Sequence, residues 1–436
     1  MTPVSRSSEA PPVRPREIFG WAMFDFANSS YTTVVITVAF SVFFTRTVAA
    51  AGRADFLWGV GLSISNGLVL LLAPVIGAIA DDSGRKKQFL FGTYVACVAG
   101  TALLALVGPG DVALALSLLV VSNIAFSYGE NLAGAFLPEI STPQTIGRIS
   151  GLGWGLGYFG GLVSLLLISR LIAPGFGADN IANLQRAWLV TAAFFLVAGS
   201  CTFVLLRERA QRGPRRSLAG YVSVGFARLA TTAREIRHFA ELAKFLLAFF
   251  LYHGGLTTVI AFAAILAERT FGFTPADLIK LFILLQLTSA AGALGFGFIQ
   301  DRIGAVRTVR VTLVIWIAAC VAGYLARTAG QFWWVAMVAG LGIGSLQSAS
   351  RALVGLFSPR AKEAEFFGFW GLAGKAAYAT GPALFGLISS ASGSQRLAIL
   401  SAALFFLAGL GALAFVDERR GIAAAASWNE GAGGGA

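Results

Sequence analysis

Four charged side chains lie within stretches that are otherwise apolar: Asp25, Glu130, Arg351 and Lys375. A charge at the centre of a membrane-spanning helix costs on the order of 3 kcal/mol on insertion scales, so each of these residues needs a specific role. Two carboxylates and two cations could bind a charged substrate, carry a proton or form a gate. The alternatives are structural ion pairs and, for Asp25, the N-terminal cap of a helix that begins later, at Asn28 or Tyr31.

Three of these four charges are expected at one depth. At about 1.5 Å per residue, Asp25, Glu130 and Arg351 lie roughly 7 to 10 Å from the cytoplasmic ends of their helices, and Lys375 lies roughly 13 to 15 Å deep. The weaker candidates for the same substrate or proton pathway are polar residues in the same stretches: Asn28, Asn131, Gln347 and His253.

Few other residues could support catalysis or bind a metal. The chain has two histidines, His238 and His253, and three cysteines that lie in separate apolar segments. No group of these residues has the spacing of metal ligands. We therefore expect no catalytic residue, no metal and no cofactor, which makes a membrane-embedded enzyme the weakest functional class. Glycine-rich runs such as "GLGWGLGYFGG" lack a flanking strand and indicate close helix packing rather than nucleotide binding.

The composition is that of a polytopic membrane protein. Of 436 residues, 56% are hydrophobic and 12% are charged, and the mean hydropathy is +0.75. Apolar windows of about 20 residues recur along the whole chain, which is the length that crosses a bilayer. They predict an all-α fold of about twelve spans, over 20–45, 56–80, 88–108, 112–137, 150–172, 186–206, 244–267, 277–300, 306–327, 331–357, 366–390 and 396–416.

The distribution of basic residues predicts the topology. With the N-terminal tail in the cytoplasm, 24 Lys and Arg residues fall on the cytoplasmic side and 8 on the other. This bias places both termini in the cytoplasm. The expected organisation is a disordered tail over 1–17, a six-helix bundle over 18–206, a basic linker over 207–243, a second six-helix bundle over 244–416 and a disordered tail over 417–436.

The linker contains apolar residues at near-helical spacing among arginines. This pattern predicts an amphipathic helix on the inner membrane face, and a solvated linker helix is the equal alternative.

An internal repeat relates the two predicted bundles. "GAIADDSGRKK" follows the second span and "GFIQDRIGAVR" follows the eighth, at a constant offset of 220 residues. The matched positions are Gly77 and Gly297, Asp81 and Asp301, Gly84 and Gly304, and Lys87 and Arg307. Because both copies occupy the same place in each half, the chain is expected to be two fused six-helix bundles related by pseudo-symmetry.

These loops resemble the signature loop of the major facilitator superfamily, whose pattern is matched by Gly77, Asp81, Gly84, Arg85, Lys86, Gly297, Asp301, Arg302 and Gly304. The glycines allow close helix approach and a tight turn, and the aspartates can pair near helix ends. The sequence departs from the pattern at Asp82, where a basic residue is usual, and at Ala305 and Val306, which lack the expected basic side chains. The resemblance implies the fold of that superfamily.

Three stretches resemble one branch of the superfamily, the autophagy-related vacuolar effluxers: "GWAMFDFANSSYTT", "AFLPEISTPQTIGRISGLGWGLGYFGG" and "EAEFFGFWGLAGKAAYATGPALFG". The resemblance implies efflux of amino acids or similar small metabolites by alternating access, without a cofactor. It also implies a bacterial member in the cytoplasmic membrane, monomeric, in contact with lipids and with a proton or cation as a candidate coupling ion. The alternative is a lipid-handling or receptor-like protein on a transporter fold.

The repeat also predicts a gate. At offset 220, Asn131 corresponds to Arg351, so Glu130 and Arg351 occupy adjacent positions on matching helices of the two halves. We expect these opposite charges to attract when the cytoplasmic ends close and to separate when those ends open.

Overall fold

The computed structural model describes residues 13–49, 53–210, 213, 216–234, 238–392 and 395–433. In these residues every regular element is helical. The first half contains α1 (Pro15–Ser30), η1 (Tyr31–Val38), α2 (Phe40–Phe43), η2 (Phe44–Val48), α3 (Ala54–Ser83), α4 (Lys86–Leu103), η3 (Leu104–Leu106), α5 (Val112–Gly134), η4 (Pro138–Ile140), α6 (Ile146–Ile172), η5 (Ala178–Asn180) and α7 (Ile181–Leu205). After α8 (Leu218–Arg234), the second half contains α9 (Ala240–Phe271), α10 (Pro275–Ile303), α11 (Ala305–Leu325), α12 (Ala329–Phe357), η6 (Arg360–Lys362), α13 (Glu363–Ser392) and α14 (Gln395–Leu413), and α15 (Glu418–Gly433) follows.

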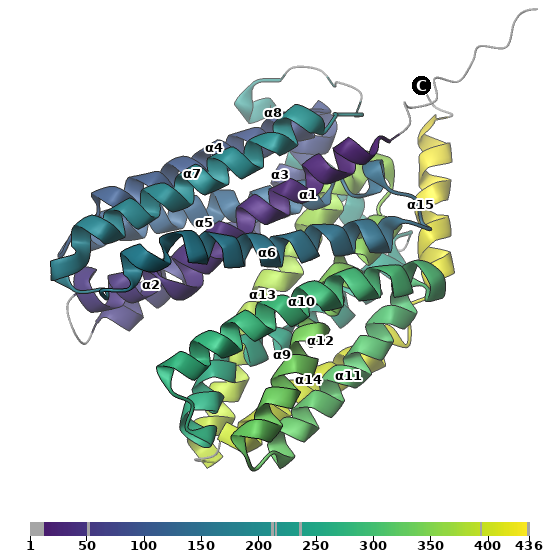
Figure 1. Ribbon diagram of the computed structural model, residues 1–436. Coiled ribbons are helices and arrows are strands. Elements are labelled where there is room, and N and C mark those ends of the chain that lie inside the picture. Colours follow the sequence, from purple (N-terminus) through teal and green to yellow (C-terminus); the bar gives the residue numbers. More distant parts are fainter. Residues whose placement is uncertain are drawn as a thin grey trace, which may run out of the picture.

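The helices form two bundles, as the repeat predicts (Figure 1). In the first bundle α1 packs on α6 and α7, and α5 packs on α3 and α4. In the second, α9 packs on α13 and α14, and α12 packs on α10 and α11. The two bundles join through α6 against α10 and through α3 against α13. These two junctions are equivalent under the repeat, because α3 corresponds to α10 and α6 corresponds to α13.

Most of the long helices are suited to a membrane. Within the described residues, ten helical segments are long and apolar enough to cross a bilayer, or eleven if the bent pair formed by α14 and α15 is counted. The predicted all-α polytopic fold is confirmed. The count of twelve spans stays a prediction, since α13 carries Glu363, Glu365 and Lys375 along its length and is not among the ten.

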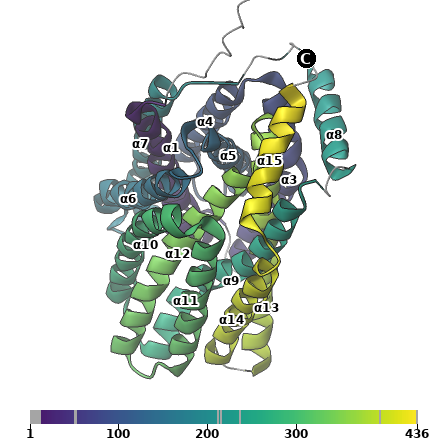
Figure 2. The same cartoon turned by 90° about the vertical axis from the view of Figure 1, so that its right-hand side faces the viewer.

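Two regions expected to be disordered contain helices. Helix α1 already begins at Pro15, within the expected tail over 1–17, of which residues 1–12 lie outside the described part of the chain. The expected tail over 417–436 is wrong for most of its length, because α15 occupies Glu418–Gly433. Helix α15 packs against α9, α12 and η6 and is seen face-on in Figure 2. Trp428 holds it there, with its ring 5.1 Å from that of Phe239.

Helix α8 lies in the linker over 207–243 and packs along α3. A Cβ at Gly225 would contact Val75 and Ile79, so α8 lies close against the last turns of α3. On the same helix, Val222 and Phe226 are exposed. Helix α8 is therefore amphipathic, with one face on the bundle and apolar side chains left uncovered by the protein.

The halves are joined at one end of the molecule. We call this the closed end and define it as the end at which α1, α4 and α13 begin, at Pro15, Lys86 and Glu363. Towards the opposite end the ribbons of the two bundles diverge (Figure 1).

Candidate functional site

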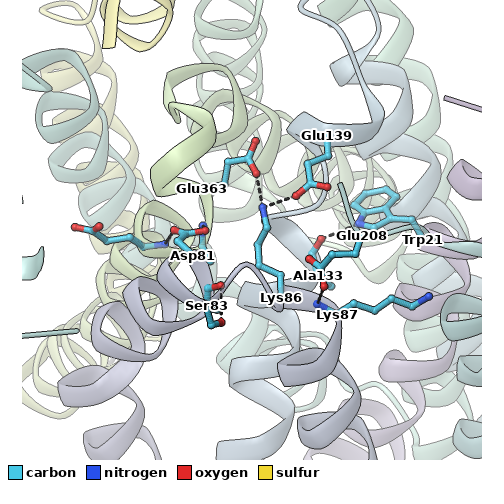
Figure 3. A network of polar contacts seen from close by, with 12 residues as sticks. Trp21, Asp81, Ser83, Lys86, Lys87, Ala133, Glu139, Glu208 and Glu363 are labelled. Carbon is cyan, nitrogen blue, oxygen red and sulfur yellow. Dashed lines mark hydrogen bonds and ion pairs between the residues drawn. The ribbon is translucent and has the colours of Figure 1, made fainter. Parts of the chain in front are cut away.

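A buried ion cluster joins three segments at the closed end (Figure 3). The Lys86 ammonium, at the first position of α4, contacts the carboxylates of Glu139 in η4 and Glu363 in α13. The side chains of Lys86 and Glu363 are each 2% exposed and that of Glu139 is 8% exposed. Since Glu363 belongs to the second half and the other two to the first, this cluster spans the interface. One cation between two carboxylates partly offsets the cost of burying all three charges.

Asp81 makes a second contact across the same interface. It lies on the last turn of α3 and accepts hydrogen bonds from the backbone N–H groups of Ala364 (3.1 Å) and Glu365 (2.9 Å). These N–H groups belong to the first turn of α13, which has no intrahelical acceptors and attracts negative charge. A Cβ at Gly77 would clash with the Ala364 carbonyl, so glycine is required where α3 meets α13.

The second copy of the loop makes the equivalent contact. Asp301, on the last turn of α10, accepts hydrogen bonds from the backbone N–H groups of Gly147 (2.8 Å) and Arg148 (3.2 Å) at the start of α6. A Cβ at Gly297 would clash with the Gly147 carbonyl. Gly84 and Gly304 end the two preceding helices with φ of 59° and 93°. Both aspartates therefore bind the first turn of a helix from the opposite half.

The side chains next to these aspartates differ in their partners. Arg85 and Arg302 have no ion pair within the described part of the chain. Asp82, which departs from the signature, pairs with Arg216 (3.1 Å) and with Arg228 of α8 (3.6 Å).

Arg351 lies at the centre of a fourth contact between the halves. Its guanidinium donates to the Asp25 carboxylate (2.6 Å), to the Ser150 hydroxyl (3.2 Å) and to the Ser150 carbonyl (2.9 Å). It also lies over the rings of Trp21 and Trp154, 4.8 and 5.2 Å from their centroids. Charge-assisted hydrogen bonds and cation–π contacts together hold Arg351 of α12 against α1 and α6.

The expected pairing of Arg351 with Glu130 is wrong, because the partner of Arg351 is Asp25. Helix α6 packs on α1 and on α12, so that Ser150 of α6 and Asp25 of α1 both reach Arg351. The alternative that Asp25 caps a later helix is also wrong, since α1 begins at Pro15, ten residues earlier.

Glu130 and Lys375 make no ion pair within 4 Å in the described residues. Each interacts electrostatically with the other, and Glu130 also interacts with Asp25 and Arg351. Both side chains are half-buried. Glu130 of the first half and Lys375 of the second therefore lie near one another. Among the described residues neither side chain has an ion-pair partner, so both could bind a ligand.

Of the weaker candidates, Asn131 and His253 lie near this pair. Asn131 lies against Gly371 of α13, and its amide nitrogen is buried with no hydrogen-bond partner among the described residues. His253 stacks on Phe249 (ring centroids 4.7 Å apart) and lies beside Gly374. Gln347 accepts a hydrogen bond from Tyr158. Asn28 is buried on α1, and its side-chain oxygen has no partner in the described residues.

Sequence reasoning missed the acidic residues that complete the closed end. Glu139 and Glu363 flank apolar stretches, where a carboxylate reads as a solvated loop residue. Their signal was positional: Glu139 follows Pro138, and Glu363 opens a helix, which is where acidic residues are favoured. Ser150 and Trp21 carried no signal, since serines and tryptophans recur throughout the spans.

Comparisons with known proteins agree with this architecture. The family model described as vacuole effluxer Atg22 like matches residues 60–426. The chain is 30% identical to the uncharacterized MFS-type transporter YxiO of Bacillus subtilis (strain 168), over 91% of this chain and 94% of that protein. It is 23% identical to autophagy-related protein 22 of Yarrowia lipolytica, over 92% of this chain and 76% of that protein.

Solved structures show the same fold. The human organic anion transporter MFSD10 (TETRAN) superposes with a TM-score of 0.75 at 16% identity, over 92% of this chain and 100% of that one. FucP, a major facilitator superfamily transporter in its outward conformation, superposes with a TM-score of 0.68 at 14% identity, over 92% of this chain and 98% of that one. The fold and the family are those of transporters rather than enzymes. With a family model matching most of the chain and a relative at 30% identity over nearly its full length, the chain belongs to the Atg22-like effluxers of the major facilitator superfamily.

Proposed function

We propose that this transporter exports amino acids or closely similar zwitterionic metabolites by alternating access. The observation that carries the proposal is that Glu130 and Lys375 lie near one another without forming an ion pair within 4 Å in the described residues. A substrate with an ammonium and a carboxylate group would satisfy both side chains at once, its ammonium at Glu130 and its carboxylate at Lys375. The two side chains come from opposite halves, so a substrate bound to both links their relative position to its own presence.

In this proposal the closed end faces the cytoplasm of a bacterial cell and the chain crosses its inner membrane twelve times, with both termini inside. The excess of Lys and Arg in the loops of that end supports the orientation. The contacts of Lys86, Asp81, Asp301 and Arg351 then hold the cytoplasmic side shut, and export requires all of them to separate. Because Asp25 and Glu130 are carboxylates within predicted spans, near Arg351 of this gate, one of them is the candidate carrier of a coupling proton. Solved relatives of the same fold include a proton:xylose symporter.

The test begins by comparing the metabolites of cells with and without the protein to choose a substrate, which is then followed in proteoliposomes. We expect Glu130→Gln and Lys375→Gln each to lower transport at least tenfold, since each removes one of two charge-assisted contacts. The amide of the substrate lacks the carboxylate, so it should compete poorly with the substrate for transport by the wild-type protein. Its affinity should not fall further in Lys375→Gln.

Matched controls are Glu268→Gln and Lys280→Gln, because both residues are exposed at the opposite end of the second bundle. Full transport by folded Glu130→Gln and Lys375→Gln variants would contradict the proposed site. Transport of uncharged solutes alone would contradict the substrate class.

A further inference from the structure

The repeat of 220 residues continues along α6 and α13. The stretch "GLGWGLGY" over 151–158 of α6 corresponds to "GLAGKAAY" over 371–378 of α13, and the first two residues and the last are identical. Each stretch belongs to a helix that packs against the opposite half, α6 against α12 and α13 against α5. Tyr158 and Tyr378 therefore occupy equivalent positions at two related contacts between the halves.

In the first copy, Tyr158 and Trp154 both bind residues of the opposite half. The Tyr158 hydroxyl donates a hydrogen bond to the side-chain oxygen of Gln347 in α12. The guanidinium carbon of Arg351, in the same helix, lies 5.2 Å from the centroid of the Trp154 ring. Since both contacts join α6 to α12, this copy of the repeat holds the two halves together.

The second copy lacks both contacts. Gly374 replaces the Trp154 of the first copy, and Ser127 of α5 corresponds to Gln347 of α12. The serine side chain is shorter than that of glutamine, and its hydroxyl is buried with no hydrogen-bond partner among the described residues. Within the same residues the Tyr378 hydroxyl makes no hydrogen bond, and Tyr378 is 50% exposed. Tyr378 therefore has a free hydrogen-bond donor where its counterpart in α6 is bound.

Tyr378 lies beside the pair formed by Glu130 and Lys375. Gly371, Lys375 and Tyr378 are spaced by four and then three residues, which places them on one face of α13. That face is turned towards the first half, because a Cβ at Gly371 would clash with the side chain of Asn131 in α5. Tyr378 lies about 4.5 Å further from the closed end than Lys375, at about 1.5 Å per residue. It also interacts electrostatically with Glu130.

We propose that Tyr378 is a further substrate-binding residue, whose hydroxyl donates a hydrogen bond to the substrate carboxylate that Lys375 binds. The inference rests on the proposed function, from which it takes the zwitterionic substrate. A phenol is a good donor to a carboxylate, and the hydrogen bond is assisted by the charge of the acceptor. Glu130 binds the ammonium group of the same substrate, so the carboxylate is the acceptor that remains for Tyr378.

The two copies of the repeat then have different roles. The first copy joins α6 to α12 through side chains of the protein, whereas the second leaves Lys375 and Tyr378 free for the substrate. The substrate therefore lies at the contact of α13 with α5, to one side of the pseudo-symmetry axis. Two donors for one carboxylate would make the free acid group a strict requirement, so carboxamides and esters should be poor substrates.

The experiment measures export from proteoliposomes that contain the purified full-length protein. A mixture of isotope-labelled L-amino acids is loaded first, and the amino acid that is exported fastest is then measured alone, beside its carboxamide. Tyr378→Phe keeps the ring and removes the hydroxyl. We expect it to raise the KM of the amino acid about tenfold and to change kcat by no more than about twofold, since the hydrogen bond contributes to binding. The KM of the carboxamide should change by no more than about twofold, because it has no charged acceptor for the hydroxyl.

Tyr158→Phe is the matched control, because it removes the hydroxyl at the equivalent position of the other copy. It should leave the KM of the amino acid within about twofold and lower the melting temperature, since its hydroxyl binds Gln347. Tyr378→Phe should leave the melting temperature unchanged, because its hydroxyl makes no hydrogen bond within the described residues.

The outcomes separate this inference from the proposed function. An unchanged KM in Tyr378→Phe, with transport lowered in Lys375→Gln, would overturn the role of Tyr378 and leave the proposed site in place. An equal rise of KM in Tyr378→Phe and Tyr158→Phe would also overturn it, as would an equal rise for the amino acid and its carboxamide. If wild type exported no amino acid, the proposed function would fail and this inference with it.

Discussion

The two signature loops occupy equivalent places but are held by different means. In the first, Asp81 binds α13 while Lys86 lies buried between Glu139 and Glu363. In the second, Asp301 binds α6, but the position equivalent to Lys86 is Val306, whose backbone N–H is bound by Glu418. The first loop therefore depends on charges buried between the halves, and the second on hydrogen bonds from Asp301 to α6 of the opposite half and on those that Glu418 of α15 accepts.

The buried ion pairs of the first loop therefore strengthen one of the two junctions, that of α3 with α13. Breaking a buried ion cluster is expensive, whereas releasing backbone N–H groups at a helix start costs less because water can replace the acceptor. We infer that the junction of α3 with α13 is the stronger of the two junctions. The junction of α6 with α10 relies on close packing and on Asp301, whose partner Arg148 is half exposed.

The largest expected effect comes from removing the cation of the first loop. Lys86→Ala leaves two buried carboxylates facing each other, which should destabilise the closed end by about 3–5 kcal/mol. Thermal unfolding and the labelling rate of a cysteine introduced at Ala364, which is buried at this junction, would measure it. Acidification should reduce the difference in stability between Lys86→Ala and wild type, because a protonated carboxyl has no charge to repel its neighbour. The control Val306→Ala, at the equivalent position, should change stability by about 1 kcal/mol. Equal effects of the two substitutions would remove the distinction between the loops.

An intermediate effect is expected at the paired aspartates. Asp81→Ala and Asp301→Ala each leave two N–H groups at a helix start without an acceptor, at a cost of about 1–3 kcal/mol. We expect the larger loss of stability for Asp81→Ala, because the other buried charges of the first loop surround Asp81. The two variants are compared by unfolding in the same detergent, and by which junction becomes accessible to labelling. A larger loss in Asp301→Ala would reverse our ranking of the junctions.

The smallest effect is expected at the glutamates that follow each half. Glu418→Ala removes acceptors from two N–H groups of α11 and should cost about 1–2 kcal/mol, in the range of a lost helix cap. Glu208→Ala removes one acceptor and an oxygen that was unpartnered, so its cost should be about half as large. Unfolding in the same detergent measures the loss of stability in both variants. If Glu208→Ala lost more stability than Glu418→Ala, the two carboxylates would not be equivalent caps.

The repeat explains how much of this site could be predicted. A constant offset of 220 residues located Gly77, Asp81, Gly297 and Asp301 and their roles at helix ends, because the motif fixes both their spacing and their place at the end of a span. The rise per residue also predicted that Asp25 and Arg351 lie at one level, and their ion pair agrees with this. Their pairing did not follow, since depth says nothing about which way a side chain points around its helix.

The remaining failures have a common physical origin. Glu139 and Glu363 lie outside the predicted spans over 112–137 and 366–390, and it is in the folded chain that both are buried against Lys86. The alanine- and glycine-rich sequence after residue 417 has the composition of a disordered tail. Trp428 and Glu418 are two of the residues that anchor α15 to the bundle. Contacts that few residues make over long distances in sequence leave no periodic signal.

Arg351 lies between two indole rings, and this arrangement has a spectroscopic consequence. Trp21 and Trp154 belong to the first bundle and the guanidinium to the second, so any separation of the bundles removes a positive charge from beside both rings. The emission wavelength of an indole shifts with the local electric field. The protein thus carries an intrinsic fluorophore pair at its own gate, and in a variant whose other tryptophans are replaced by phenylalanine the gate could be followed in real time without a label.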